Sequence, residues 1–363
     1  MRIQDIINAI EELAPINYAE EFDNVGLLVG SSQNKVTGTL ITLDTLEAVV
    51  DEAIEKNCNL IISFHPIIFS GLKKLNGSDY VEKTVIKAIQ NKIAIYAIHT
   101  ALDNCFEGVN NAICERLNLL NRKILIPKKF TIQKLTTYVP VSNIEQVRNA
   151  LFDVGAGGIG DYDNCSFNIE GIGSFKGNER AKPSIGEIGE MRYEKEVQLN
   201  VTFPKHLTAP ILKKLFEEHP YEEVAYEIIS LENTNQNIGM GMIGNLPEVM
   251  NEKDFLKLVK QKFNCGIVRH SKFLNKPVQK IAVLGGSGSF AIEAAKRAEA
   301  DIFITSDLKY HDFFKAENIV LADIGHYESE QFTKNLLFSY LTKKLPNFAF
   351  ILSNTDTNPI KYL

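Results

Sequence analysis

Two histidine–carboxylate pairs occupy equivalent positions in this chain. His99 and Asp103 follow an apolar run at 92–98, and His326 and Glu330 follow another at 318–324. In a helix, residues four apart lie on one face, so each pair could present an imidazole and a carboxylate together. His65 follows a third apolar run. Donors of these types are ligands of Zn, Mn or Fe, so the pattern predicts a site for one or two divalent metal ions.

Such a site would have a chemical purpose. A divalent ion needs three or four protein donors and lowers the pKa of a bound water. Bridging carboxylates can hold two ions about 3.5 to 4 Å apart. The alternative is structural, because carboxylates also stabilise the positive ends of helices and histidines can cap loops.

The elements that must position these donors alternate along the chain. Apolar runs typical of strands are followed by segments with helical periodicity, both in the first 120 residues and after residue 250. This alternation predicts βαβ units and a mainly parallel sheet. Parallel strands end at one edge of a sheet, where open α/β sheets bind ligands. We therefore expect the donors to converge there.

The pattern changes in the middle of the chain. From about residue 126 to residue 239, strands with period-two alternation flank two predicted helices. The simplest interpretation is a discontinuous α/β domain with mainly parallel sheets flanked by helices, residues 1–125 and 240–363. An inserted α+β domain occupies residues 126–239, since insertion between surface elements is well tolerated.

Composition narrows the class of protein. The 363 residues carry a formal net charge of −6 without a basic stripe, which argues against nucleic-acid binding. No apolar run reaches membrane-spanning length, and the first residues do not resemble a signal peptide. The 5 cysteines show no Cys-x-x-Cys spacing, so we expect no disulfide framework and a cytoplasmic location.

Several further residues could do chemistry. His311 lies four residues after Asp307 and could move protons, although it could equally be a solvated helix histidine. Asp307 could cap a helix or act in catalysis, and Asp23 could orient a ligand or stabilise a turn. The loop 285–289, Gly-Gly-Ser-Gly-Ser, could bind an anion through its backbone N–H groups or could be a tight turn. The segment 219–223, His-Pro-Tyr-Glu-Glu, has no neighbours at ligand spacing and is interpreted as structural.

Together these motifs resemble the Nif-three-like family of GTP cyclohydrolase I type 2 homologs, over almost the whole chain. The matching segments are 23–27 (Asp-Asn-Val-Gly-Leu), 63–66 (Ser-Phe-His-Pro), 99–103 (His-Thr-Ala-Leu-Asp), 305–311, 323–330, and, in the middle of the chain, 155–167 and 219–223. The ordered set is specific, and chance is a poor explanation for it.

The resemblance implies two metal ions close together, bound by His65, Asp103, His326 and Glu330, with His99 nearby. It also implies a ring-shaped homohexamer and an insert similar to the trimeric PII and CutA proteins. One departure concerns the residue before His65. The family usually has a second histidine where this chain has Phe64, and since phenylalanine cannot ligate a metal, one metal position is expected to be weakened.

Two hypotheses of function follow. The first is a metal-dependent hydrolase of a small anionic, nucleotide-like substrate, with His99 or His311 as the catalytic group that moves protons. The second is a non-catalytic hexameric scaffold that binds metal or senses a ligand through the insert. Neither hypothesis involves nucleic acid or a membrane.

Overall fold

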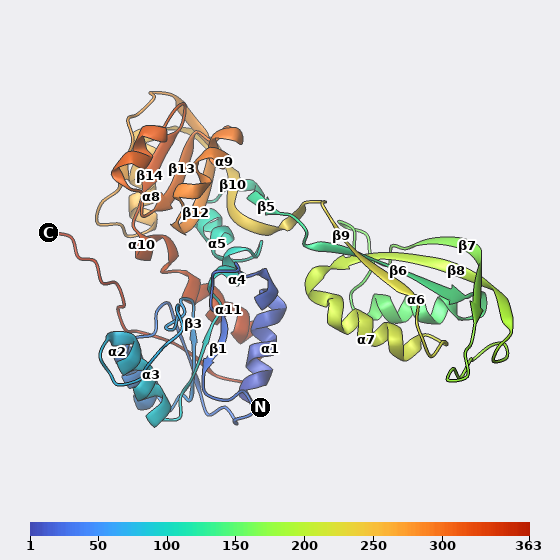
Figure 1. The fold of residues 1–363 in the computed structure, drawn as a ribbon. Coiled ribbons are helices and arrows are strands. Elements are labelled where there is room, and N and C mark those ends of the chain that lie inside the picture. Colours follow the sequence, from blue (N-terminus) through green and yellow to red (C-terminus); the bar gives the residue numbers. More distant parts are fainter. The chain divides into compact units, whose positions relative to one another are not determined.

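The computed structural model describes residues 1–363 and divides the chain into two compact units (Figure 1). The first unit joins Met1–Pro127 to Gln236–Leu363, and the second is Lys128–Asn235. The first unit contains two mixed sheets flanked by helices, so the prediction of a mixed α/β protein is confirmed at this level. No helix is both long enough and apolar enough to span a membrane.

The first sheet of this unit is parallel except for one edge strand. In sheet order its strands are β1 (Gly26–Val29), β4 (Ala94–Ala97), β3 (Leu60–Ser63), β2 (Thr39–Thr42) and β15 (Phe350–Leu352). Side chains of successive strand residues point to opposite faces, and both faces are buried. Leu40 and Ile61 therefore enter one core, while Ile41 and Ile62 enter another.

Helices cover both faces of the first sheet (Figure 1). The helices on the smaller core are α2 (Glu47–Glu55) and α3 (Tyr80–Gln90), and those on the larger core are α1 (Ile3–Leu13) and α11 (Thr333–Lys344). The fully buried Ile3, Ile6 and Ile10 share one side of α1, as the spacing i, i+3, i+7 requires.

The second sheet has three parallel strands at its centre. In sheet order its strands are β11 (Arg269–His270), β14 (Val320–Asp323), β13 (Ile302–Ser306), β12 (Pro277–Ser287), β10 (Asn235–Asn251) and β5 (Leu120–Lys128). β12, β13 and β14 run parallel, whereas β11 and β10 pair with them antiparallel. Its main helices are α5 (Val109–Arg116), α8 (Glu252–Lys262) and α9 (Ile292–Arg297).

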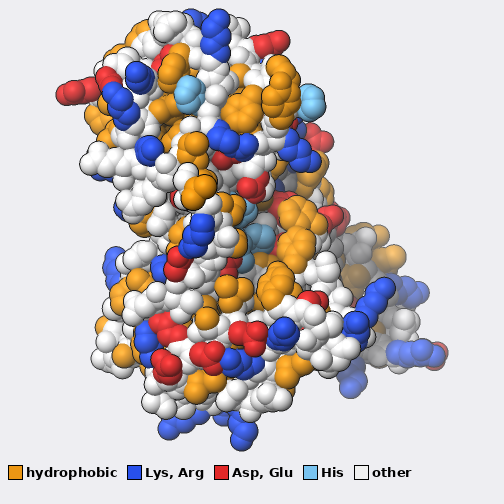
Figure 2. All heavy atoms as spheres, turned by 90° about the vertical axis from the view of Figure 1, so that its left-hand side faces the viewer, with side chains coloured by type: hydrophobic (Ala, Val, Ile, Leu, Met, Phe, Trp, Pro, Cys, Tyr) orange, Lys and Arg blue, Asp and Glu red, His pale blue; other side chains and the backbone are white.

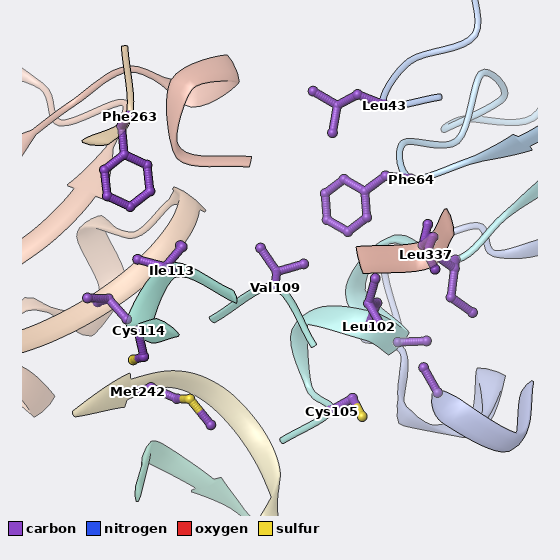
Figure 3. Packing of buried hydrophobic residues seen from close by; sticks show 14 of the residues in the cluster. Leu43, Phe64, Leu102, Cys105, Val109, Ile113, Cys114, Met242, Phe263 and Leu337 are labelled. Atoms are coloured by element: carbon purple, nitrogen blue, oxygen red, sulfur yellow. The ribbon is translucent and has the colours of Figure 1, made fainter. Parts of the chain in front are cut away.

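One hydrophobic core joins the two sheets. It includes Ile41 and Ile62 of the first sheet and Ile304 and Ala322 of the second. In Figure 3, Val109 of α5 points into the same interior as Phe64, Phe263 and Ile113, among other buried residues of this core. Residues that precede and follow the second unit in sequence are therefore parts of one packed body.

The second unit is a four-stranded antiparallel sheet with two helices on one face. Its elements in chain order are β6 (Ile132–Pro140), α6 (Ile144–Asp153), β7 (Phe167–Lys176), β8 (Met191–Pro204), α7 (Thr208–Glu218) and β9 (Tyr226–Leu231). The strand order β7-β8-β6-β9 and the βαββαβ sequence are those of a ferredoxin-like fold. Leu135, Leu199 and Val201 form its core with the helices.

Short helices complete the chain. They are α4 (His99–Asp103), α10 (His326–Glu330) and the 3-10 turns η1 (Ile16–Tyr18), η2 (Val141–Asn143), η3 (Lys205–Leu207), η4 (Ser289–Ala291) and η5 (Tyr310–Lys315). The sequence pattern predicts a helix from Glu330 to Leu341, and most of this segment is helical in α11. The predicted start is wrong, because Glu330 ends α10 and α11 begins at Thr333.

Candidate metal centre

Two five-residue helices each carry one predicted donor pair. α4 begins at His99 directly after β4 and ends at Asp103, and α10 begins at His326 after β14 and ends at Glu330. The expectation that both pairs are helical and one turn apart is therefore confirmed. A glycine with φ of +93°, Gly325, makes the turn from β14 into α10, a conformation that residues with a Cβ rarely adopt.

Donors from the two sheets meet at Glu330. Its Oε2 lies 3.1 Å from Nε2 of His65, which follows β3, and 3.1 Å from Nε2 of His326. One ligand atom from each of these three residues lies within 4.8 Å of the other two, so the triad could hold a metal ion. The imidazole rings of His65 and His326 are 5.4 Å apart between centroids.

The carboxylate oxygens have few partners in the protein. Oδ1 of Asp103 is buried without a hydrogen-bond partner, and the groups close to Oε2 of Glu330 are the two imidazoles, each 3.1 Å away. Buried carboxylate oxygens without partners are costly, and a cation would relieve that cost. The residues present therefore fit a divalent ion, with Glu330 as the shared ligand.

Asp103 lies at the edge of this arrangement. It is only 9% exposed and interacts electrostatically with Glu330, His65 and His326, but it is not part of the compact triad. Burial, followed by the negative charge of Glu330, raises the pKa of Asp103 well above its usual range. Without a cation, Asp103 therefore holds a proton more readily than an ordinary carboxyl.

Three further aspartates orient the histidines. Nδ1 of His65 donates to Asp44 at 2.7 Å, Nδ1 of His326 donates to Asp307 at 2.7 Å, and Nδ1 of His99 donates to Asp23 at 2.9 Å. A carboxylate on Nδ1 fixes the tautomer and would leave Nε2 available to a metal ion, as in many metal sites with histidine ligands.

Hydroxyl groups hold these three aspartates in place through hydrogen bonds. Thr357 donates to Asp44, Thr100 donates to Asp23 and Ser287 donates to Asp307. This outer layer draws on several elements of the first unit, including the segment that follows β15. Sequence reasoning left Asp23 and Asp307 open between turn and chemical roles and missed Asp44. The available signal was that Asp44, like His65, follows directly on a parallel strand.

The charges of the triad depend on one another. Burial alone would lower the pKa of His65, but the carboxylates of Asp44 and Glu330 outweigh it and raise the pKa to about 10. Burial would also lower the pKa of His326, but the carboxylates of Asp307 and Glu330 raise it to about 11. Burial would raise the pKa of Glu330, yet the two histidines hold it well below its usual range.

Two residues of this arrangement have an unusual backbone conformation. His99 has a φ of +26° and Asp307 a φ of +57°. Residues with side chains rarely adopt positive φ, and such strained conformations persist at sites that the surrounding structure holds in place.

The glycine loop 285–289 packs against Glu330, and two of its N–H groups are not open to an anion. The N–H of Gly285 donates to Asn110, and the N–H of Gly286 donates to Ser329, each at 3.0 Å. A Cβ on Gly286 would lie 2.4 Å from Oε1 of Glu330. Because these two N–H groups are already used, the alternative of a tight turn describes this part of the loop better than a phosphate cradle.

A pocket of about 340 Å³ opens above the histidines. His65, His99 and His326 line it together with Asp44, and Phe69, Pro66, Tyr327 and Ile360 are among its apolar neighbours. In Figure 2 histidine side chains lie in a hollow beside a group of hydrophobic side chains. No lysine or arginine lines the pocket.

The two predicted proton-transfer residues differ in position. His99 lines the pocket, and its ring centroid is 5.3 Å from that of His65. His311 is exposed on η5, where its ring contacts Tyr310 and Phe314, and it does not line the pocket. The structure therefore brings His99, but not His311, to the pocket beside the candidate triad.

The sequence is similar to those of known proteins over nearly its whole length. The sequence model of the family Duf34/NIF3 (NGG1p interacting factor 3) matches residues 1–359. A Bacillus subtilis protein named GTP cyclohydrolase 1 type 2 homolog is 41% identical over 367 residues, 99% of this chain and 98% of that protein. A Listeria monocytogenes protein of the same name is 36% identical over 97% of this chain and 96% of its own length.

Solved structures are similar over the whole length. The crystal structure of a Bacillus cereus protein related to NIF3 has a TM-score of 0.87 and 36% identity, covering 100% of this chain and 99% of that one. A crystal structure of a Staphylococcus aureus protein has a TM-score of 0.79 and 31% identity, with coverage of 100% and 99%. The resemblance drawn from the motifs is thereby confirmed.

Proposed function

Since this chain belongs to the Duf34/NIF3 family, we propose that it is a metal-dependent hydrolase of a small anionic substrate. The name GTP cyclohydrolase 1 type 2 homolog, carried by its relatives, suggests a nucleotide-like compound. The observation that supports the proposal most strongly is the meeting of His65, His326 and Glu330, whose ligand atoms lie within 4.8 Å of one another.

Each residue has a role in this proposal. His65, His326 and Glu330 bind the first ion, and Asp103 supplies the carboxylate for a second. When bound, a divalent ion polarises an oxygen of the substrate and makes water more acidic. His99, held through Nδ1 by Asp23, keeps Nε2 free to accept or return a proton at the pocket. His311 remains a weaker candidate for this step, because it is exposed away from the pocket.

The pocket also limits how an anionic substrate is bound. Because no lysine or arginine lines it, the bound ion would have to supply the positive charge. The apolar neighbours Phe69, Tyr327 and Ile360 are suited to contact a ring, and they would reduce the access of bulk water to the reacting group.

The test is hydrolysis by protein loaded with Zn²⁺, Mn²⁺ or Fe²⁺, assayed against GTP, other nucleotides and simple phosphoesters. Glu330→Ala should lose activity and metal together, whereas Glu55→Ala, which removes an exposed glutamate of α2, should keep both. Equal turnover by the unmodified protein and Glu330→Ala would refute the proposal that the protein is a metal-dependent hydrolase.

One observation favours the second hypothesis, a scaffold that binds metal without catalysis. Phe64 is fully buried, and its ring lies 4.8 Å from that of His65 and 5.5 Å from that of His99. A hydrocarbon ring thus occupies a position from which a histidine could add a ligand. Phe64→His should then add metal, with Phe64→Leu as the control for altered packing. Extra metal without turnover of any substrate would favour the scaffold.

We further propose that the protein assembles as a ring of six copies, with an insert of the PII and CutA type. The βαββαβ order of the second unit supports this. On the sheet face opposite its helices, Phe167, Ile169 and Ile229 are exposed, and such patches mark interfaces. Light scattering after size-exclusion chromatography tests it. A monomer would refute the assembly, and Ile169→Asp should reduce the mass if this face is used.

A further inference from the structure

The second unit contains a pocket of about 380 Å³ that the metal centre does not use. It lies on the same sheet face as the exposed Phe167 and Ile169 but farther along β7, near the end of that strand and the start of β8. Its apolar walls include Phe175, Pro183 and Ile185, and the aromatic rings of Tyr138 and Tyr221 contribute as well. A mostly apolar pocket with a few polar groups is the usual form of a small-molecule site.

Glu196 is the buried acid of this pocket. Its side chain belongs to β8, and the residue is 8% exposed. Oε1 accepts a hydrogen bond from the hydroxyl of Tyr221 at 2.8 Å, and no lysine, arginine or histidine forms an ion pair with the carboxylate. The arginine on the same strand, Arg192, is paired with Glu194 instead. A buried carboxylate without a cation is rare, since such charges are normally paired.

A glycine makes room for this carboxylate. A Cβ on Gly173 would lie 2.0 Å from Oε2 of Glu196, so the acid can lie across the strand only because position 173 has no side chain. Gly173 also lines the pocket. The carboxylate is therefore seated at the floor of the pocket and does not extend into solvent.

The motif His-Pro-Tyr-Glu-Glu holds the acid in place. Nε2 of His219 donates to the carbonyl of Tyr138 at 3.0 Å, and Nδ1 accepts the N–H of Tyr221 at 3.1 Å. Burial lowers the pKa of His219, which favours the neutral ring that this pair of bonds requires. Burial and the hydrogen bond to Glu196 raise the pKa of Tyr221, so its hydroxyl keeps the proton that it donates.

The loop 177–190 forms the outer wall. The backbone N–H of Lys182 donates to Glu222 at 2.5 Å, and the hydroxyl of Ser184 donates to the carbonyl of Pro220 at 2.7 Å. Glu222 and Glu223 line the pocket together with Glu196, and Lys176 is the one basic residue in its lining. The lining thus carries an excess of negative charge, which disfavours anionic ligands.

We propose that this pocket binds a small organic cation, an amidinium or ammonium group on an apolar body the size of one ring, with Glu196 as its counter-ion. The cation would supply the partner that the carboxylate lacks, and an amidinium could donate two N–H groups to it. The body would contact Phe175, Pro183 and Ile185, and the faces of Tyr138 and Tyr221 would add cation–π attraction.

The experiment compares two probes on the full-length protein. Benzamidine carries the cation, and benzamide is a neutral molecule of nearly the same shape. Calorimetry or NMR titration should detect saturable binding of benzamidine, with benzamide at least tenfold weaker. Equal affinity for the two probes, or no saturable binding of benzamidine, would overturn the proposal without any mutation.

Two variants then test whether benzamidine binds in this pocket, next to Glu196. Glu196→Gln keeps the shape of the side chain and should weaken benzamidine at least tenfold. Glu227→Gln, an exposed glutamate of β9 that does not line the pocket, should bind it as the unmodified protein does. Circular dichroism checks that both variants are folded. Benzamidine affinity that is unchanged in folded Glu196→Gln would also overturn the assignment.

Discussion

Gly286 and Glu330 lie so close together that only glycine fits at position 286. A Cβ there would lie 2.4 Å from Oε1 of Glu330, and the φ of +69° is one that other residues rarely adopt. The same glycine donates its N–H to Ser329, the residue before Glu330. The glycine loop after β12 therefore determines where the carboxylate of Glu330, the candidate shared metal ligand, can lie.

Gly286→Ala should displace the Glu330 carboxylate. We expect metal affinity to fall at least tenfold and the protein to lose about 1–2 kcal/mol from the positive φ alone. Calorimetric titration with Zn²⁺ or Mn²⁺ measures the first effect and chemical denaturation the second. Gly77→Ala is a matched control, because its φ is +77° but its nearest neighbours are ordinary contacts at 3.8 Å and beyond. Equal metal affinity in the two variants would contradict the role of Gly286.

Asp44→Asn should weaken metal binding without unfolding the protein. The amide cannot hold the Nδ1 proton of His65 as a carboxylate does, so the imidazole loses its preferred tautomer and basicity. Loss of such an outer carboxylate typically costs 10- to 100-fold in metal affinity. Competition with a chromogenic chelator measures the change. Asp51→Asn, an exposed residue paired with Lys87, should leave the affinity unchanged.

Metal binding should release protons and strengthen as pH rises. In the metal-free protein the pKa values of about 10 for His65 and about 11 for His326 keep both imidazoles protonated near pH 7. A cation must displace the Nε2 protons, so we expect roughly two protons released per ion and weaker binding at lower pH. Calorimetry in buffers of different ionisation enthalpy counts the protons. An affinity that is constant between pH 6 and 9 would be inconsistent with this charge state.

The same raised pKa values affect the stability of the metal-free protein. Each histidine stabilises the folded protein most at pH values below its unfolded pKa of about 6.5. This stabilisation is lost as the pH rises through the folded-state pKa values. Metal-free protein should therefore become less stable from neutral pH toward pH 10. Bound metal should reverse the trend, which thermal melting across this range would reveal.

Glu52→Gln should loosen the segment after β15. The Glu52 carboxylate accepts hydrogen bonds from Ser353, Asn354 and Thr355, and from Lys56 on its own helix. Burial would raise the pKa of Glu52, but these bonds lower it to about 2. The stabilisation is present above about pH 4.5 and is lost as pH falls through 2.

We expect Glu52→Gln to cost about 2 kcal/mol at pH 7, after allowance for solvent screening. Urea denaturation measures the loss, and the difference from the unmodified protein should shrink below pH 4.5. Glu55→Gln, exposed on the same helix, should be neutral. If Glu52→Gln lost the same unfolding free energy at pH 2 as at pH 7, the negative charge of Glu52 would not be the cause of the loss.

Local patterns were enough to predict many elements of the first unit. Helix Ile3–Leu13 has the bounds that its periodicity predicts, and the buried runs around Leu60–Ser63 and Val320–Asp323 are strands. These features depend on the burial of neighbouring residues, which composition and spacing encode directly. The i, i+4 spacing of His99 with Asp103 and of His326 with Glu330 was readable for the same reason.

Other features depend on contacts that no local pattern carries. The break between Glu330 and Thr333 contains neither glycine nor proline, so nothing in the pattern ends the helix there. The approach of His65 to Glu330 requires two sheets to share one core, and alternation of strands and helices does not say which sheets meet. Asp44 and Glu196 were missed because each acquires its role from partners distant in the chain.

The origin of the three triad residues has a consequence for the order of events in the cell. His65 is synthesised well before His326 and Glu330, and the whole second unit, residues 128–235, is made between the two groups. A nascent chain thus has no complete triad until residue 330 has been added. An ion held by all three residues could be captured only after the segments on either side of the second unit have packed together.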